Sequence, residues 1–147
     1  MANGTVGLKK LITKILTTMA DRVIEVDEVA STMTLGGTSK NITWIYRKWS
    51  SGKKEAWFNW NSASVACNTQ HTNGYRSAEF VANVPDIGFS DPKICVMAHN
   101  SGTYVSTIFV DYYDSTNKQL HFYVYCGASQ SSSSSRYVET HIFMTEG

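Results

Sequence analysis

The sequence has few charges, only two prolines and no long apolar run. Charged side chains make up 17% of its 147 residues, and 13 basic and 12 acidic groups nearly cancel. A nucleic-acid-binding domain normally carries a basic face, so this balance predicts no nucleic-acid partner. No apolar run could span a bilayer, and Lys14 and three threonines interrupt the stretch from Leu8 to Ala20. We therefore expect neither membrane insertion nor a signal peptide.

Cysteine is scarce as well. Cys67, Cys95 and Cys126 are an odd number, lie far apart and include no C-x-x-C motif. Disulfide frameworks and cysteine-based metal sites normally show even numbers or paired spacings. We expect three buried thiols in a protein made in a reducing cytoplasm.

Recognisable catalytic motifs are absent. The sequence contains no G-x-S-x-G, no G-x-x-x-x-G-K-[ST] and no H-E-x-x-H, which are signatures of a nucleophile elbow, a phosphate-binding loop and a zinc site. Its four histidines are isolated, without a His-x-His pair. We therefore predict no metal, no cofactor and no enzymatic activity. A pair of carboxylates brought together by folding could still hydrolyse glycans, and candidates are scattered: Glu55, Glu79, Asp86, Asp91, Asp111 and Asp114.

The first part of the chain has helical periodicity. Its apolar residues follow i, i+3, i+4, i+7 spacing, which predicts one stripe of an amphipathic helix: Leu8, Leu11, Ile12, Ile15, Leu16, Met19 and Val23. A helix of about four turns is marginal alone, so its stripe must be covered. Packing on its own domain, self-association with other subunits and adsorption to a membrane surface remain open. For self-association, the heptad positions are Leu8, Ile12, Ile15 and Met19.

A change in composition follows this segment. Ser31 to Ser39 is rich in Ser, Thr and Gly, which is typical of a linker. We therefore predict an N-terminal helix and linker for assembly or attachment over residues 1–38, and a β-domain over 39–147. From Asn41 onward, β-branched and aromatic runs separated by turn residues predict strands.

The stretch from Trp44 to Trp57 predicts a hairpin. Two aromatic-rich runs flank Ser50-Ser51-Gly52, where glycine allows a tight reversal. Large rings at strand spacing favour packing, so we expect these tryptophans to be structural and to bind no ligand.

This hairpin also carries a resemblance. The sequence Tyr46-Arg47-Lys48-Trp49-Ser50-Ser51-Gly52-Lys53-Lys54-Glu55-Ala56-Trp57 resembles the opening of the C-terminal domains of many bacteriophage tail fibres. Those domains continue through a "P…F…P.v" segment, here Val84 to Ile94, into a closing strand, here Tyr137 to Gly147. The similarity covers Thr43 to Gly147 and extends loosely to H-type lectin domains. Where W-x-A-x-G is a common ending, this chain has Phe143-Met144-Thr145-Glu146-Gly147.

The resemblance implies an all-β fold, a jelly-roll-like antiparallel β-sandwich preceded by the short N-terminal amphipathic helix. It also implies a homotrimer in the virion, made in the bacterial host cytoplasm and joined to other virion proteins through its N-terminal segment. The expected function is a fibre or appendage tip that binds a host-surface receptor, a glycan or a protein. The alternatives are a structural accessory, such as a head fibre or capsid-decorating protein, and a glycan-directed hydrolase.

Polar and aromatic loop residues are the candidates for receptor contact, because rings stack on ligands while amides and hydroxyls adapt their hydrogen bonds. We expect the Tyr75–Arg76 pair to matter most, because a guanidinium beside a ring can stack on a sugar and bind its hydroxyls. The full candidate set is Trp60, Asn68, His71, Asn73, Tyr75, Arg76, Asn100, Tyr104, Tyr113 and Asp114.

Overall fold

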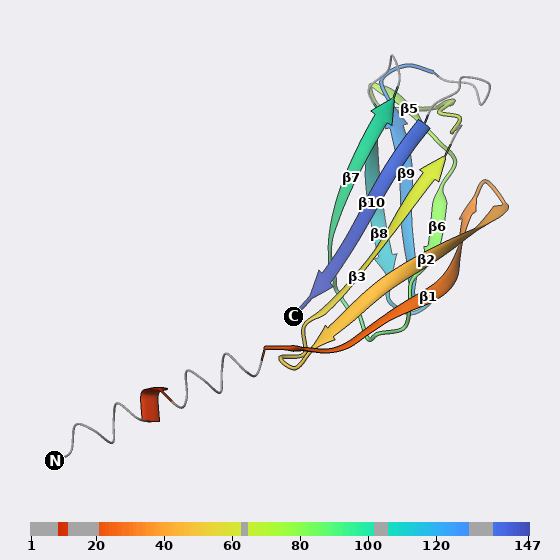
Figure 1. The fold of residues 1–147 in the computed structure, drawn as a ribbon. Coiled ribbons are helices and arrows are strands. Elements are labelled where there is room, and N and C mark those ends of the chain that lie inside the picture. Colours follow the sequence, from red (N-terminus) through yellow and green to blue (C-terminus); the bar gives the residue numbers. More distant parts are fainter. Residues whose placement is uncertain (1–8, 12–20, 63–64, 102–105, 130–136) are drawn as a thin grey trace.

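The computed structural model describes residues 9–11, 21–62, 65–101, 106–129 and 137–147. Apart from a helical turn at residues 9–11, its regular structure is ten β-strands (Figure 1). The strands are β1 (Val23–Leu35), β2 (Thr38–Trp49), β3 (Lys54–Ser62), β4 (Thr69–His71), β5 (Gly74–Arg76), β6 (Phe80–Asn83), β7 (Lys93–Ser101), β8 (Ser106–Asp114), β9 (Gln119–Cys126) and β10 (Tyr137–Glu146).

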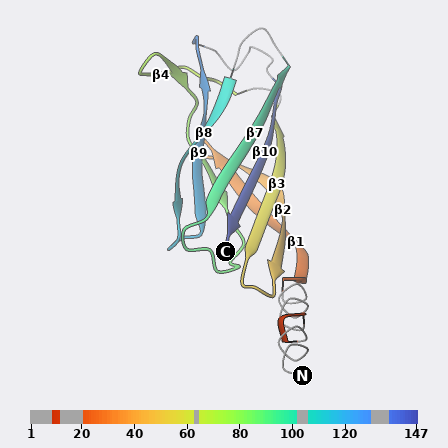
Figure 2. The same cartoon turned by 90° about the vertical axis from the view of Figure 1, so that its left-hand side faces the viewer.

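All described pairings are antiparallel and form one path, β4-β5-β9-β6-β1-β2-β3-β10-β7, with β8 on the other side of β9. This path folds over itself into two layers (Figure 2). One layer contains β7, β10, β3, β2 and most of β1, and the other contains β8, β9 and β6 with the β4–β5 hairpin. The end of β1 joins them, because Met33 to Leu35 pair with β6. The prediction of an all-β sandwich is confirmed.

The core lies between the two layers and follows the two-residue period of the strands. On β2, Trp44 is fully buried, and its ring lies 4.5 Å from that of Phe58 on β3. On the opposite layer, Phe80 and Phe122 stack at 5.0 Å, and Trp60 meets Phe80 edge-on. Aromatic pairs in these geometries add attraction beyond the area they bury.

The Trp44–Trp57 hairpin forms as predicted. Ile45 to Lys48 pair with Lys54 to Trp57, and Gly52 has a φ of 92° in the turn. The tryptophans of this hairpin, which we expected to be structural, fall into two groups, because strand neighbours face opposite sides. Trp44 points inward, whereas Trp49 and Trp57 lie half-buried on the outer face.

The predicted linker is wrong. Residues 31–35 are the end of β1, Gly36 and Gly37 form the turn with φ values of 52° and 86°, and β2 begins at Thr38. The polar composition that suggested a linker belongs to a strand with solvent on one side. The proposed boundary at residue 38 would cut this hairpin. An assembly role for the N-terminal segment stays a prediction.

The described part of the N-terminal segment is short. Only residues 9–11 of the predicted helix are described as helical, and Leu11 is exposed. The heptad residues Leu8, Ile12, Ile15 and Met19 lie outside the described residues.

The expectation of three buried thiols is corrected at one position, because Cys95 on β7 is exposed while Cys67 and Cys126 are buried.

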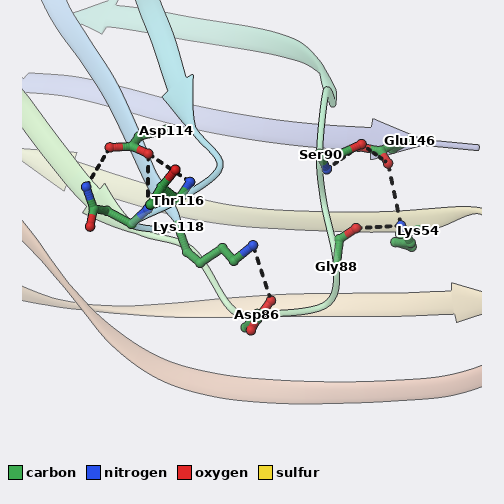
Figure 3. A network of polar contacts seen from close by, with 9 residues as sticks. Lys54, Asp86, Gly88, Ser90, Asp114, Thr116, Lys118 and Glu146 are labelled. Carbon is green, nitrogen blue, oxygen red and sulfur yellow. Dashed lines mark hydrogen bonds and ion pairs between the residues drawn. The ribbon is translucent and has the colours of Figure 1, made fainter.

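The loop between Pro85 and Pro92 is fastened by polar contacts (Figure 3). Lys54 Nζ donates to the Gly88 carbonyl at 2.6 Å, and the Glu146 carboxylate accepts the Ser90 N–H at 2.7 Å. Lys118 lies 3.7 Å from Asp86. The loop thereby joins the end of β10 to the β8–β9 turn and closes one end of the sandwich.

Candidate binding surface

The outward side of β9 carries aromatic residues. Leu120, Phe122, Val124 and Cys126 are buried, and the residues between them therefore face away from the core. These outward residues are His121, Tyr123 and Tyr125. A strand with aromatic side chains on its exposed face offers flat surfaces to a ligand.

Strand β8 adds two more rings beside them. Phe109 stacks on Tyr123 at 6.0 Å and meets Tyr125 edge-on at 5.7 Å. A bulge between Val110 and Tyr112 shifts the register. In a regular strand, Phe109 and Tyr112 would face opposite sides. Because the bulge adds one residue between them, both lie on the same face, and Tyr112 stacks on His121 at 4.2 Å.

The β4–β5 hairpin closes the other side of this surface. Arg76 pairs with Tyr125 across the strands, and its Cζ lies 5.2 Å from the ring of Tyr123. His71 lies 5.9 Å from the same ring. The turn that joins β4 to β5 holds Thr72 at a φ of 49°, a conformation that is unfavourable for a β-branched residue.

Gly74 permits the close approach of this hairpin to β9. A Cβ at this position would lie 2.5 Å from the Tyr125 hydroxyl and 2.7 Å from the Cys126 carbonyl oxygen. Any other side chain would push the hairpin away from Tyr125. The spacing between His71, Arg76 and the β9 rings therefore depends on this glycine.

Together these elements form one surface, which we call the aromatic surface: His71, Arg76, Phe109, Tyr123 and Tyr125. His71, Thr72 and the three rings line a depression of about 320 Å³. The Arg76 guanidinium packs on the ring of Tyr123. None of the described carboxylates forms an ion pair with Arg76. Its N–H groups remain available for an external acceptor.

A second group lies further along the same face. His121 Nδ1 is 3.1 Å from a Glu79 carboxylate oxygen, and Tyr112 covers the imidazole ring. Partial burial, followed by the negative charge of Glu79, raises the pKa of Tyr112. Tyr112 therefore stays a neutral hydrogen-bonding phenol over the physiological range.

Some of the residues that the sequence predicts for receptor contact lie at the aromatic surface, and others lie in the core. His71 and Arg76 belong to the aromatic surface, and the exposed Asn73 lies in the turn between them. Asn68 is exposed just before β4. Tyr75 points the other way and packs against the core, so the expected Tyr75–Arg76 pair does not form one surface. Trp60 is also a core residue.

Two further candidates stabilise the opposite end of β9. The Asp114 carboxylate accepts the N–H groups of Thr116 and Asn117 at 2.8 and 3.0 Å, which fixes the β8–β9 turn (Figure 3). The backbone N–H of Asn117 contributes most to lowering the pKa of Asp114. Tyr113 packs edge-on against Phe89. Tyr104 and the side chain of Asn100 lie outside the described residues.

Sequence reasoning missed Phe109, Tyr123 and Tyr125. The alternation of apolar and aromatic residues from Leu120 to Cys126 was the available signal. In the structure, the aromatic side of this alternation lies on an outer face of the sandwich.

Within the described ranges, no three His, Cys, Asp or Glu side chains are grouped as a metal site. None of the described helical residues belongs to a helix long and apolar enough to cross a membrane. No family model, curated protein or solved structure matches the chain in the three comparisons made.

Proposed function

We propose that this chain is a bacteriophage virion protein, a fibre or appendage tip, and that its β-sandwich binds a host-surface glycan through the aromatic surface. The Arg76 guanidinium beside Tyr123, with Phe109, Tyr125 and His71 around it, is the observation that carries the proposal. The placement in a virion rests on the fibre resemblance, which also implies a jelly-roll-like sandwich and a homotrimer.

The chemistry of the aromatic surface suits a sugar. Exposed rings can cover the apolar face of a pyranose, and tyrosine hydroxyls can bind its oxygens. A guanidinium supplies several N–H donors in a fixed plane, which favours hydroxyl or carboxylate acceptors. A depression of about 320 Å³ offers room for a small part of a glycan.

The experiment compares two pairs of substitutions by glycan binding and host-cell attachment. Arg76→Ala and Tyr123→Ala should each reduce binding at least about tenfold, because each removes a direct contact worth about 1.4 kcal/mol or more. Arg22→Ala and Met97→Ala are the matched controls, since both residues are exposed and lie outside the aromatic surface. Arg76→Lys keeps the charge but loses the planar donor set, so it should restore only part of the binding.

Unchanged attachment of the Arg76 and Tyr123 variants would contradict the assignment of this surface. Absence of binding by the unmodified protein would favour a structural accessory instead. Release of reducing sugar from cell-wall polysaccharide would favour a hydrolase.

One observation supports the accessory alternative. The outer face of the other layer carries Met97 and Val26, which are 64% and 62% exposed. Trp57 and Phe143 lie between them on adjacent strands, with ring centres 6.4 Å apart. Arg47 of β2 is the register partner of Val26 and lies 5.4 Å from the Trp57 ring. Exposed apolar side chains grouped around one cation in this way can contact another virion protein.

A further inference from the structure

Cys67 and Cys126 lie side by side in the core although 59 positions separate them in the sequence. Their sulfur atoms are 2.9 Å apart, and the two residues are 0% and 1% exposed. Cys67 precedes β4, and Cys126 ends β9. The fold therefore brings together two cysteines that the sequence presents as unrelated.

The surrounding backbone holds both residues in place. Val124 and Ser77 exchange two hydrogen bonds, one from the Ser77 N–H at 2.9 Å and one from the Val124 N–H to the Ser77 hydroxyl at 3.0 Å. The Val124 carbonyl oxygen also lies 3.7 Å from the Cys67 sulfur. Cys126 is held by β-pairing opposite Tyr75.

We propose that Cys67 and Cys126 are a cross-linking site and form a disulfide bond in the mature protein. The bond length is about 2.05 Å, so the two sulfurs, now 2.9 Å apart, need to approach by less than about 1 Å. A side-chain adjustment suffices for this, without a rearrangement of the strands. The odd cysteine count is then explained as one bonded pair and one exposed thiol, Cys95 on β7.

The oxidant is a small-molecule disulfide, RSSR. One cysteine thiolate attacks RSSR, forms a mixed disulfide and releases RS⁻; the second thiolate attacks the cysteine sulfur of that mixed disulfide and releases the second RS⁻. Two thiols lose two protons and two electrons, and RSSR becomes two RSH. Because both sulfurs are buried in the folded chain, the reaction takes place during folding or in an opened state.

The cross-link would fasten two parts of the aromatic surface. Cys67 lies two residues before β4, which carries His71, and Cys126 follows Tyr125 directly. A bond between them fixes the β4–β5 hairpin against β9 independently of the hydrogen bonds between the strands. This inference concerns the fold and stands whether or not the surface binds a glycan.

The test uses the full chain, folded once in a buffer with reduced glutathione in excess over oxidised glutathione, which leaves the exposed Cys95 as a thiol, and once with excess dithiothreitol. Each sample is denatured, alkylated and weighed as an intact protein, and its peptides are mapped. We expect one alkylated cysteine, Cys95, in the oxidised sample, with a Cys67–Cys126 linked peptide and a mass lower by two hydrogens before alkylation. The reduced sample should have three alkylated cysteines.

Two variants make the result specific. Cys95→Ser should give no alkylated cysteine after oxidation, and its oxidised form should melt roughly 10 °C above its reduced form, because the bond closes a long loop. Cys126→Ala should leave Cys67 and Cys95 both alkylated. Three alkylated cysteines in the oxidised wild type, a link through Cys95, or glutathione adducts on Cys67 and Cys126 would each overturn the proposal.

Discussion

Arg47 on β2 and Glu55 on β3 are register partners, and the Arg47 guanidinium donates a hydrogen bond to the Glu55 carboxylate. Lys53 Nζ and the indole N–H of Trp49 reach the same carboxylate at 2.8 and 3.1 Å. Burial would raise the pKa of Glu55, but these contacts outweigh it and lower the pKa to about 2. A buried, charged carboxylate thus stabilises the β2–β3 turn.

Glu55→Gln should lower the free energy of unfolding by about 2 kcal/mol at neutral pH, since it leaves the cations without their charged partner. The pKa in the folded state lies below the unfolded value of 4.5. The contribution of Glu55 is therefore complete above pH 4.5 and is lost as the pH falls towards 2. Urea unfolding at several pH values measures this. Asp91→Asn is the control, because that side chain is 92% exposed. If Glu55→Gln lowered the free energy of unfolding equally at pH 2.5 and at pH 7, the stabilising role of the charged Glu55 carboxylate would be refuted.

The tryptophans of one hairpin should differ in their effect on stability. Trp44→Ala should cost about 3–5 kcal/mol, because Trp44 is fully buried against Phe58 and its indole N–H donates to the Asn83 carbonyl at 2.8 Å. Trp57→Ala should cost about 1 kcal/mol, since Trp57 lies half-buried on the outer face. Denaturant unfolding of both variants tests the inward and outward assignments. Equal losses would contradict them.

Gly74→Ala should destabilise the protein by about 1–3 kcal/mol, because its Cβ would lie too close to Tyr125 and to the Cys126 carbonyl oxygen. Gly127→Ala is the matched control, with nothing within 4 Å of the added Cβ. Glycan binding should fall only in the first variant, since it separates the β4–β5 hairpin from β9. A Gly74→Ala protein with wild-type melting would show that the hairpin accommodates a side chain.

The local features of the fold were predictable from the sequence. The Trp44–Trp57 hairpin is specified by two aromatic runs and a glycine turn, all within 14 residues. Strand β1 was missed at its end because Ser31, Thr32 and Thr34 are polar. Their pairing with β2 is a local hairpin across Gly36 and Gly37. The pairing of Thr34 with Val81 of β6 is non-local, and composition in a short window contains no information on such a partner.

The candidate surface was predictable only in part, for a similar reason. His71 and Arg76 were recognised as loop-like polar residues near an aromatic ring. The ring expected beside Arg76 was Tyr75, but adjacent residues of a strand face opposite sides. The true neighbour, Tyr123, comes from β9 and is 47 positions away. Register between distant strands, including the bulge in β8, decides which rings meet.

Glu146 should protect the loop between Pro85 and Pro92 from opening. Burial acts to raise the pKa of Glu146, but the N–H groups of Ser90 and Asp91 outweigh it and lower the pKa. Glu146→Gln weakens these charge-assisted bonds, so the Ser90 and Asp91 amides should exchange hydrogen faster. Residue-resolved hydrogen exchange measures this, with the exposed Glu28→Gln as the control. Unaltered exchange at both amides would exclude this role for Glu146.

Self-association should depend on the N-terminal segment. We expect the full chain to be a trimer of 16.4 kDa subunits, held partly by the stripe Leu8, Ile12, Ile15 and Met19, because the short helix that their spacing predicts would need a partner surface. Ile12→Asp with Ile15→Asp should shift the mass towards the monomer in light scattering. Lys9→Ala with Lys10→Ala lies outside the stripe and should leave the mass unchanged.

The structure also determines where a truncation can be made. Removal of residues 1–20 leaves β1 intact and should give a folded sandwich with weaker assembly. A truncation before Asn41 removes β1, the strand that pairs with both β2 and β6. The truncated protein should therefore not fold, and its denaturant titration should show no cooperative transition. A full chain that remains a 16.4 kDa species at micromolar concentration would contradict self-association. A folded protein that starts at Asn41 would contradict the role of β1 in joining the two layers.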